Sequence, residues 1–272
     1  MLWTPADTTT DLWLDASHAS TITISTGVSQ WRDKSGNSRH ASQSTGGSQP
    51  SVAAAAQNGL SGVRFNGSQF LSCGDTLDIR TGNQTIFIVA KFATSGDQCL
   101  IAKSLSGPGI DRWSIYRYSN QLYGMYYYDY TTGGIDPTIG AFGYTSANMI
   151  STRLERGSAA NYKIRLNGTL LNTTTFINES NDLNNAYRLL IGAYNNSNET
   201  GQVFYLNGDI YEIIILQSAV SDTLRYYIEG YLAWKWGLQA SLPAGHPYYS
   251  AAPGTLFYPA MVMQSSQLLG AC

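Results

Sequence analysis

The sequence predicts an all-β fold, a two-sheet antiparallel jelly-roll sandwich with one short C-terminal helix. Three observations lead to this prediction. Short runs rich in Ile, Val, Phe, Tyr and Thr recur along the 272 residues and alternate with clusters of Gly, Asn, Asp and Ser, a pattern typical of antiparallel sandwiches. Asn-Gly dipeptides, which favour tight hairpin turns, lie between or beside some of these runs. One stretch near the end has apolar residues at helical spacing.

Eight segments have the length and composition of β-strands. They are residues 85–92, 99–103, 112–118, 121–128, 149–154, 162–166, 187–191 and 202–216. Each carries β-branched or aromatic residues, which fit a pleated and half-buried surface. Asn167-Gly168 follows one strand and precedes Thr169, so it predicts a tight hairpin turn with positive φ angles. Asn207-Gly208 is expected to form a similar turn.

The single helix is predicted over about residues 221–237, with Ser221 as its N-cap and Gly237 as its stop. Its apolar face should pack on the sandwich. That face is formed by residues spaced i, i+4, i+7 and i+8, which are Leu224, Ile228, Tyr231 and Leu232. We interpret the aromatic residues of this helix as packing residues, with an aromatic ligand platform as the alternative; they are Tyr227, Tyr231, Trp234 and Trp236.

Residues 1–250 are expected to form one domain that includes this helix, because no charge run or Pro-rich linker divides them. Residues 251–272 have a different character, with an apolar run at 256–263. A segment this apolar is expected to be covered, either by packing back across the sheets or by docking on a neighbouring subunit. We favour docking, which leads to a homo-oligomer or a larger assembly.

Distinctive motifs lie near both ends of the chain. They are Leu12-Trp13-Leu14-Asp15-Ala16-Ser17, the run WRDKSGN at 31–37, VRFNG at 63–67, and EGYLAWKWGL at 229–238 continuing to His246-Pro247-Tyr248. The first three together resemble the opening of a concanavalin A-like (laminin G-like) lectin/glucanase β-sandwich. The C-terminal motif is similar to modules of bacteriophage virion proteins and bacterial surface proteins. The resemblance covers roughly residues 8–250 and implies the fold more firmly than the function.

Three features favour a non-enzymatic phage virion surface protein with a lectin-like domain for adhesion or glycan recognition: the phage-like resemblance, a missing secretory signal in a chain with a lectin-like fold, and the apolar C-terminal segment. The alternative is a capsid decoration or tail structural protein that cements its neighbours without binding sugar. Expected partners are therefore capsid or tail proteins of the virion and cell-surface glycans. Residues 1–7 show no secretory signal, so we expect synthesis in the bacterial cytoplasm and a final location on the virion surface.

Composition excludes several other classes of function. Charged residues make up 12% of the chain and the formal net charge is −2, against about 25% charged residues in an average domain. This charge gives no reason to bind nucleic acid or an anionic membrane. No apolar run reaches the roughly 20 residues of a membrane-spanning helix. The three cysteines form no disulfide or zinc pattern, and we expect Cys73 and Cys99 to be small core residues.

Catalysis is not expected. A glycoside hydrolase needs two carboxylates that face each other, and the nearest pair along the chain is Asp209 and Glu212. Their spacing of three residues predicts opposite faces of a strand. A glycoside hydrolase with carboxylates from different strands remains a second alternative. No nucleophile elbow or His-Glu-x-x-His zinc motif is present.

Calcium is the one candidate cofactor. Asp33, Ser35 and Asn37 place oxygen-bearing side chains at alternate positions around Gly36, an arrangement that suits a hard cation. The competing interpretation, which we favour, is an Asx-type turn in which Asp33 and Asn37 bond to their own backbone.

The candidate ligand surface is an aromatic stretch in the middle of the chain. Its residues are Trp113, Tyr116, Tyr118, Tyr123, Tyr126 and Tyr128. Strand alternation predicts that Tyr126 and Tyr128 share a face and that Tyr127 lies on the other. Outward Tyr and Trp rings suit sugars or a protein partner, since they are flat, apolar and polar-rimmed. In the alternative interpretation, half of these rings fill the core and the rest cover a sheet face.

Overall fold

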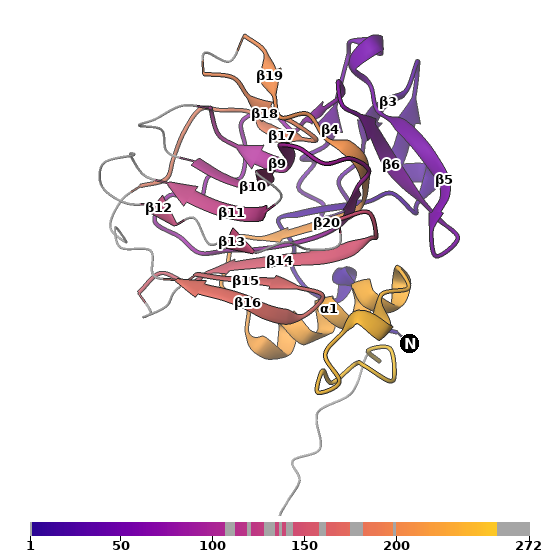
Figure 1. Cartoon of the computed structure of the whole chain (residues 1–272), viewed down its shortest axis with the longest axis vertical. Coiled ribbons are helices and arrows are strands. Elements are labelled where there is room, and N and C mark those ends of the chain that lie inside the picture. Colours follow the sequence, from indigo (N-terminus) through magenta and orange to yellow (C-terminus); the bar gives the residue numbers. More distant parts are fainter. Residues whose placement is uncertain are drawn as a thin grey trace, which may run out of the picture.

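The computed structural model describes residues 2–106, 112–118, 121–127, 134–135, 138–139, 144–157, 162–174, 182–197 and 200–254. For residues 112, 125–127, 134–135, 138–139 and 174 it describes the backbone alone. Two large antiparallel sheets lie face to face, and one helix packs outside one of them (Figure 1). The predicted two-sheet sandwich is therefore confirmed.

The first sheet has eight strands. Its order is β16 (Thr169–Thr174), β15 (Tyr162–Leu166), β14 (Asn148–Leu154), β8 (Gln84–Phe92), β20 (Asn207–Leu216), β6 (Leu60–Asn66) and β5 (Ser51–Gln57), and β1 (Leu12–Asp15) also pairs with β20.

The second sheet has ten strands. Its order is β12 (Gly134–Ile135), β11 (Gln121–Tyr127), β10 (Arg112–Tyr118), β9 (Gln98–Lys103), β17 (Leu189–Ile191), β7 (Leu71–Ser72), β4 (Ala41–Ser42), β3 (Val28–Trp31) and β2 (Ile22–Ile24), and β13 (Thr138–Ile139) pairs with β11. A separate two-stranded hairpin consists of β18 (Tyr194–Asn195) and β19 (Gln202–Val203). Short 3-10 turns lie at Pro5–Asp7, Ala19–Thr21, Gly46–Ser48 and Gln239–Ser241.

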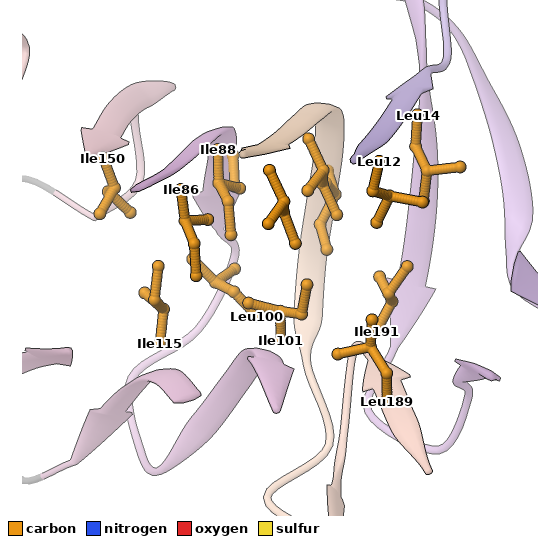
Figure 2. Packing of buried hydrophobic residues seen from close by; sticks show 14 of the residues in the cluster. Leu12, Leu14, Ile86, Ile88, Leu100, Ile101, Ile115, Ile150, Leu189 and Ile191 are labelled. Atoms are coloured by element: carbon orange, nitrogen blue, oxygen red, sulfur yellow. The ribbon is translucent and has the colours of Figure 1, made fainter. Parts of the chain in front are cut away.

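The main core fills the space between the two sheets. Figure 2 shows Ile86 and Ile88 from β8 facing Leu100 and Ile115 from the opposite sheet. Alternate residues on each strand point into this layer, because successive side chains of a strand lie on opposite faces. Each fully buried Ile or Leu contributes roughly 1.5–3 kcal/mol relative to an exposed one. The core therefore fixes which face of each strand is left for other contacts.

The helix α1 (Asp222–Lys235) packs against the outer face of the eight-stranded sheet. Ile228 and Leu232 belong to the same cluster as Phe87 and Ile214 of the sheet. The Ser221 hydroxyl caps the helix by accepting a hydrogen bond from the Leu224 amide at 3.2 Å. Gly237, with φ of +70°, follows the last turn. The prediction of a helix over about residues 221–237 is confirmed.

The turn predictions had mixed outcomes. Asn167 and Gly168 have φ of +50° and +80° and connect β15 to β16, as predicted. The prediction for Asn207-Gly208 is wrong, because both residues lie inside β20. A Cβ atom on Gly208 would lie 2.2 Å from the Lys91 carbonyl oxygen, so this glycine permits close approach of two strands. Another tight hairpin in the described part of the chain is at Asn58, between β5 and β6.

Six predicted strands match β8, β9, β10, β14, β15 and, in part, β17. Residues 202–216 divide into β19 and β20, since Phe204 between them has φ of +53°. Tyr128, predicted to end a strand, lies outside the described residues.

Cys99 is buried as expected, and Cys73 is partly exposed but packs against the main core. Burial raises the pKa of the Cys73 thiol to about 12. Among the described helices, none has the length and apolarity to cross a bilayer.

Candidate functional site

The outer face of the eight-stranded sheet carries both Asp209 and Glu212, although their spacing of three residues predicts opposite faces. A β-bulge between Ile210 and Glu212 interrupts the pairing of β20 with β8. Ile210 and Ile213 both belong to the main core, so the bulge places Asp209 and Glu212 on the same outer face. The prediction that they lie on opposite faces is wrong, because the bulged residue shifts the alternation.

Glu212 is fully buried and accepts hydrogen bonds from four different side chains. The indole N–H of Trp13 donates to Oε1 at 2.7 Å, and the Tyr231 hydroxyl donates to the same oxygen at 2.9 Å. The Lys235 ammonium and the indole N–H of Trp236 both donate to Oε2 at 2.7 Å. Burial and the negative charge of Asp15 raise the pKa of Glu212, and Lys235 opposes this change. This carboxylate is enclosed by the protein.

Asp15 lies beside Glu212 across the β1–β20 pairing and shares Lys235 with it. The Lys235 ammonium is 2.7 Å from Oδ1, and the Lys34 ammonium is 2.9 Å from Oδ2. Burial acts to raise the pKa of Asp15, but the charge and hydrogen bonds of these lysines and the Ser17 bond outweigh it and lower the pKa to about 2. We call Asp15, Lys34, Glu212 and Lys235 the buried charge cluster.

The buried charge cluster explains the distinctive motifs at the two ends of the chain. Trp13 and Asp15 come from the first motif, Lys34 comes from the second, and Lys235 and Trp236 come from the C-terminal motif. Segments almost 200 residues apart in sequence therefore meet at one place. These motif residues hold the helix on the sheet.

Two more buried carboxylates, those of Glu229 and Asp209, also contact basic side chains. Glu229 contacts the Arg225 guanidinium at 2.5 Å and the His246 Nε2 at 3.2 Å. The His246 Nδ1 accepts a hydrogen bond from the Tyr248 amide at 3.1 Å, so His246 fixes the loop that follows the helix. Asp209 lies 2.7 Å from Arg64, and Lys91 is also within 3.3 Å. Burial acts to raise the pKa of Asp209, but these cations lower it.

The outer face of the ten-stranded sheet differs because aromatic rings lie on it. Tyr116 and Tyr123 are cross-strand partners on β10 and β11, and their rings stack with centroids 5.2 Å apart. The Tyr118 ring meets the Tyr123 ring edge-on at 6.1 Å, and Tyr118 is 45% exposed. We call Tyr116, Tyr118 and Tyr123 the tyrosine cluster. The three rings form a continuous patch that is flat in part and rimmed by hydroxyl groups.

The tyrosine cluster rests on a second layer of aromatic residues. Tyr194 from β18 lies 6.2 Å from Tyr116, and Phe204 lies 6.0 Å from Tyr194. Both pack with Cys99 and Ala102 of β9. The Tyr194 hydroxyl accepts a hydrogen bond from Ser104 at 2.6 Å. This support fixes the Tyr116 ring and lowers the entropic cost of using the patch for binding.

The other aromatic residues predicted for this surface have different positions. Trp113 is 1% exposed and belongs to the main core with Ile115, so it is excluded from the ligand surface. Successive side chains along β10 point to opposite faces, so Trp113 points inward while Ser114 and Tyr116 point outward. Only the backbone of Tyr126 is described, paired with Trp113 and Ile135. Tyr128 lies outside the described residues.

The Asp33 side chain forms the predicted Asx-type turn, but the prediction for Asn37 is wrong, because its side chain bonds to a distant part of the backbone. Asp33 Oδ1 accepts hydrogen bonds from the amides of Trp13 and Ser35, each at 2.9 Å, and Oδ2 accepts one from the Ser35 hydroxyl at 2.7 Å. The Asn37 side-chain nitrogen donates to the Thr10 carbonyl at 3.1 Å. A calcium ion would have to displace these donors from Asp33. In the described ranges, no group of three or more His, Cys, Asp or Glu residues is placed to hold a metal ion.

A shallow polar groove lies on the same outer face as the tyrosine cluster, beyond β17 and β7. It has a volume of about 400 Å³ and is lined by Thr23, Ser25, Ser29, Gln30, Ser42, Gln43, Ser44 and Gln49. Cross-strand pairing places Gln30, Ser42, Ser72, Leu190, Ala102 and Ser114 in one row, which establishes the shared face. Sequence reasoning missed this groove, because small polar residues from three short strands carry no local signal.

Comparisons with known proteins support the fold. No protein-family model matches the sequence, and no curated protein matches it. The structure is similar to the binding domain of Paraclostridial Mosquitocidal Protein 1, with a TM-score of 0.57 and 13% identity over 80% of this chain and 51% of that one. It is also similar to a Trypanosoma rangeli sialidase in complex with sialic acid, with a TM-score of 0.52 and 12% identity over 78% of this chain and 31% of that one.

A third structure is the carbohydrate-binding module CBM40 of a Ruminococcus gnavus sialidase bound to α2,3-sialyllactose, with a TM-score of 0.46 and 14% identity over 60% of this chain and 93% of that one. This chain spans about half the length of the mosquitocidal binding domain and about a third of the trypanosomal sialidase. The two structures with TM-scores above 0.5 support the β-sandwich fold of this chain.

Proposed function

We propose that this chain is a non-catalytic, lectin-like module that binds glycans through the tyrosine cluster and is displayed on the surface of a bacteriophage virion. The observation that carries the proposal is the stacked, partly exposed patch of Tyr116, Tyr118 and Tyr123 on the outer face of the ten-stranded sheet. Tyr rings offer an apolar plane for the C–H groups of a sugar and a hydroxyl for its polar rim.

The surroundings of the patch favour a neutral, hydroxyl-rich ligand. The polar groove on the same face is lined by Ser, Thr and Gln residues and by no charged side chain. Amide and hydroxyl groups can both donate and accept hydrogen bonds, as sugar hydroxyls require. The low proportion of charged residues in the chain, 12%, agrees with such a ligand.

The proposal of a non-catalytic role rests on the state of the carboxylates. In the described part of the chain, the four fully buried carboxylates all contact a lysine or arginine; they are Asp15, Asp209, Glu212 and Glu229. A glycosidase needs a pair of carboxylates about 5–10 Å apart that both face the sugar. These four carboxylates are enclosed by the protein and held by their lysine or arginine partners, which supports a non-catalytic role.

The virion part of the proposal rests on the similarity of the C-terminal motif to phage virion modules. Residues 229–238 of that motif attach the helix to the sandwich through Lys235 and Trp236. The proposed partners are of two kinds. One is the virion proteins that carry the module, and the other is the glycans of the host cell. Copy number in purified particles, measured by quantitative mass spectrometry, tests this part separately from sugar binding.

The sugar-binding part is tested by titrating the full chain against a glycan panel and intact bacterial cells, with and without calcium. The double variant Tyr118→Ala/Tyr123→Ala is expected to bind at least about tenfold more weakly, a loss of roughly 1.4 kcal/mol. Tyr249→Ala is the matched control, because Tyr249 is 42% exposed and lies away from the cluster. Its affinity should equal that of the wild type.

Three outcomes would contradict the proposal. Saturable binding that is unchanged in the double variant would place the sugar elsewhere on the molecule. Absence of binding to every glycan and cell would favour a protein that only cements the virion. Release of reducing ends from a bound polysaccharide would show that the chain is an enzyme.

A further inference from the structure

An apolar pocket of about 360 Å³ lies beside the first half of α1, far along the chain from the tyrosine cluster. Its walls include Tyr226 and Tyr227 of the helix, Pro247 and Tyr248 of the following loop, and Ala251 and Ala252. Neither the glycan proposal nor the buried charge cluster uses this pocket.

The walls of the pocket are fixed by contacts on their far sides. The Tyr248 carbonyl accepts a hydrogen bond from the Trp234 indole at 2.8 Å, and a Cβ atom on Gly230 would lie 2.8 Å or less from the Tyr248 ring. The Tyr227 ring lies 5.3 Å from the Tyr248 ring and 5.6 Å from the Trp3 ring. The pocket is therefore preformed, which favours a defined occupant.

The lining determines the chemistry of that occupant. Aromatic rings, a proline and two alanines form most of the surface, and Thr223 supplies a hydroxyl at the rim. Among the residues that the structure describes, no charged side chain lines the pocket. An apolar or aromatic side chain gains free energy on leaving water here, by roughly 25 cal/mol for each Å² covered.

The chain itself supplies such side chains directly after the pocket. Residues 255–272 lie outside the described residues, and their sequence contains no Asp, Glu, Lys or Arg. Residues 256–263 read Leu-Phe-Tyr-Pro-Ala-Met-Val-Met. The last described residues are held close by, because the Pro253 carbonyl accepts a hydrogen bond from the Trp3 amide at 2.9 Å and Gly254 pairs with Leu2.

The distance along the chain indicates whether the segment that fills the pocket comes from the same chain or from a second copy. Ala252 forms part of the pocket wall, and Leu256 follows four residues later, a span of at most about 14 Å. A tether this short gives an effective concentration in the millimolar range. A second copy of the chain would have to reach that concentration to compete.

We propose that the apolar pocket is the docking site for residues 256–263 of the same chain, with Phe257 or Tyr258 inserted between Tyr226, Tyr248 and Ala251. The segment then covers an exposed apolar surface in its own molecule. On this proposal it does not extend to a neighbouring subunit, and assembly has to use another surface.

The test is disulfide cross-linking in the full chain with Cys272→Ser. One protein carries Thr223→Cys and Phe257→Cys, and the control protein carries Leu171→Cys and Phe257→Cys. Thr223 and Leu171 are both exposed, but Thr223 lies at the pocket and Leu171 lies on β16 of the sandwich. Circular dichroism and thermal melting confirm that each protein is folded before a mild oxidant is added.

The proposal predicts an intramolecular cross-link at position 223 that forms at least about tenfold faster than the one at position 171. Non-reducing electrophoresis and peptide mass spectrometry identify it as a species of monomer mass. Cross-linked dimers at position 223 would overturn the proposal, since the segment would then come from a second copy. Equal rates at the two positions would also overturn it. None of these outcomes depends on whether the tyrosine cluster binds glycans.

Discussion

The two outer faces of the sandwich differ in what covers them. On the eight-stranded sheet, α1 covers the face, and the buried charge cluster joins helix to strands. On the ten-stranded sheet, the β18–β19 hairpin packs over β9, and the tyrosine cluster and the polar groove stay accessible on either side of it. A sandwich has two outer faces available for binding. In this protein the helix packs on one of them, which we call the closed face, and the tyrosine cluster and the polar groove lie on the other, which we call the open face.

The comparison predicts that the closed face determines stability, and Glu212→Ala should show the largest effect. The variant leaves the indole N–H groups of Trp13 and Trp236 without their acceptor and removes one of the two carboxylates that neutralise Lys235. Removing one partner of a buried charge pair costs about 3–5 kcal/mol of unfolding free energy. Chemical denaturation measures this loss.

Glu155→Ala is the control for that measurement. Glu155 also contacts an arginine, Arg153 at 2.7 Å, but its side chain is 34% exposed. Such a surface pair contributes about 0–1 kcal/mol. If the two glutamate variants lose similar stability, the buried charge cluster does not hold the closed face together.

Asp15 gives the closed face a pH dependence of intermediate size. Its pKa in the folded protein is about 2, below the ordinary value of 3.8 for an aspartate. A lowered pKa stabilises the folded state above pH 3.8, and this contribution is lost as the pH falls toward 2. The shift corresponds to about 2 kcal/mol.

The measurement compares the wild type with Asp15→Asn by denaturation at several pH values. The difference in stability should be largest near neutral pH and should shrink between pH 4 and 2, where Asp15 becomes protonated. A difference that stays constant over this range would show that Asp15 does not titrate as described.

The smallest effect is expected on the open face. Tyr118→Ala should change the free energy of unfolding by no more than about 0.5 kcal/mol, because Tyr118 is 45% exposed and lies outside the core. Trp113 lies five residues earlier on the same strand but faces inward. Trp113→Ala should therefore cost about 3–5 kcal/mol of unfolding free energy. Thermal denaturation of the two variants would test whether β10 separates a binding face from a core face. A large loss for Tyr118→Ala would mean that the tyrosine cluster is structural.

Local sequence patterns predicted the elements whose causes are local. The helix follows from Ser221, Gly237 and the apolar spacing between them, and the β15–β16 hairpin follows from Asn167-Gly168. The strand from Gln84 to Phe92 was recognised because β-branched and aromatic residues are concentrated there. The Asx-type turn at Asp33 was also predicted, since its hydrogen bonds to Ser35 join residues close in sequence.

Three of the six residues predicted for the ligand surface lie together on one sheet face, for the same local reason, and their role in binding stays a prediction. Tyr116, Tyr118 and Tyr123 lie on the outer face and in contact, and strand alternation is enough to place them together once β10 and β11 pair. Trp113 was misplaced because alternation gives two sets of side chains and does not tell which set faces the core. That choice depends on the opposite sheet, whose strands come from other parts of the chain.

The sequence by itself therefore determined the fold class, the helix, most strand positions and the residues of the tyrosine cluster. Tertiary structure alone decided where that face lies. It placed the bulge that brings Asp209 and Glu212 to one side, and it joined Trp13 to a carboxylate 199 residues away. It also assembled the polar groove from three short strands and the apolar pocket from a helix and the loop after it. The physical reason is that backbone periodicity and turn preference act between near neighbours in sequence, whereas burial, charge pairing and cavity shape depend on residues that meet only in the folded chain.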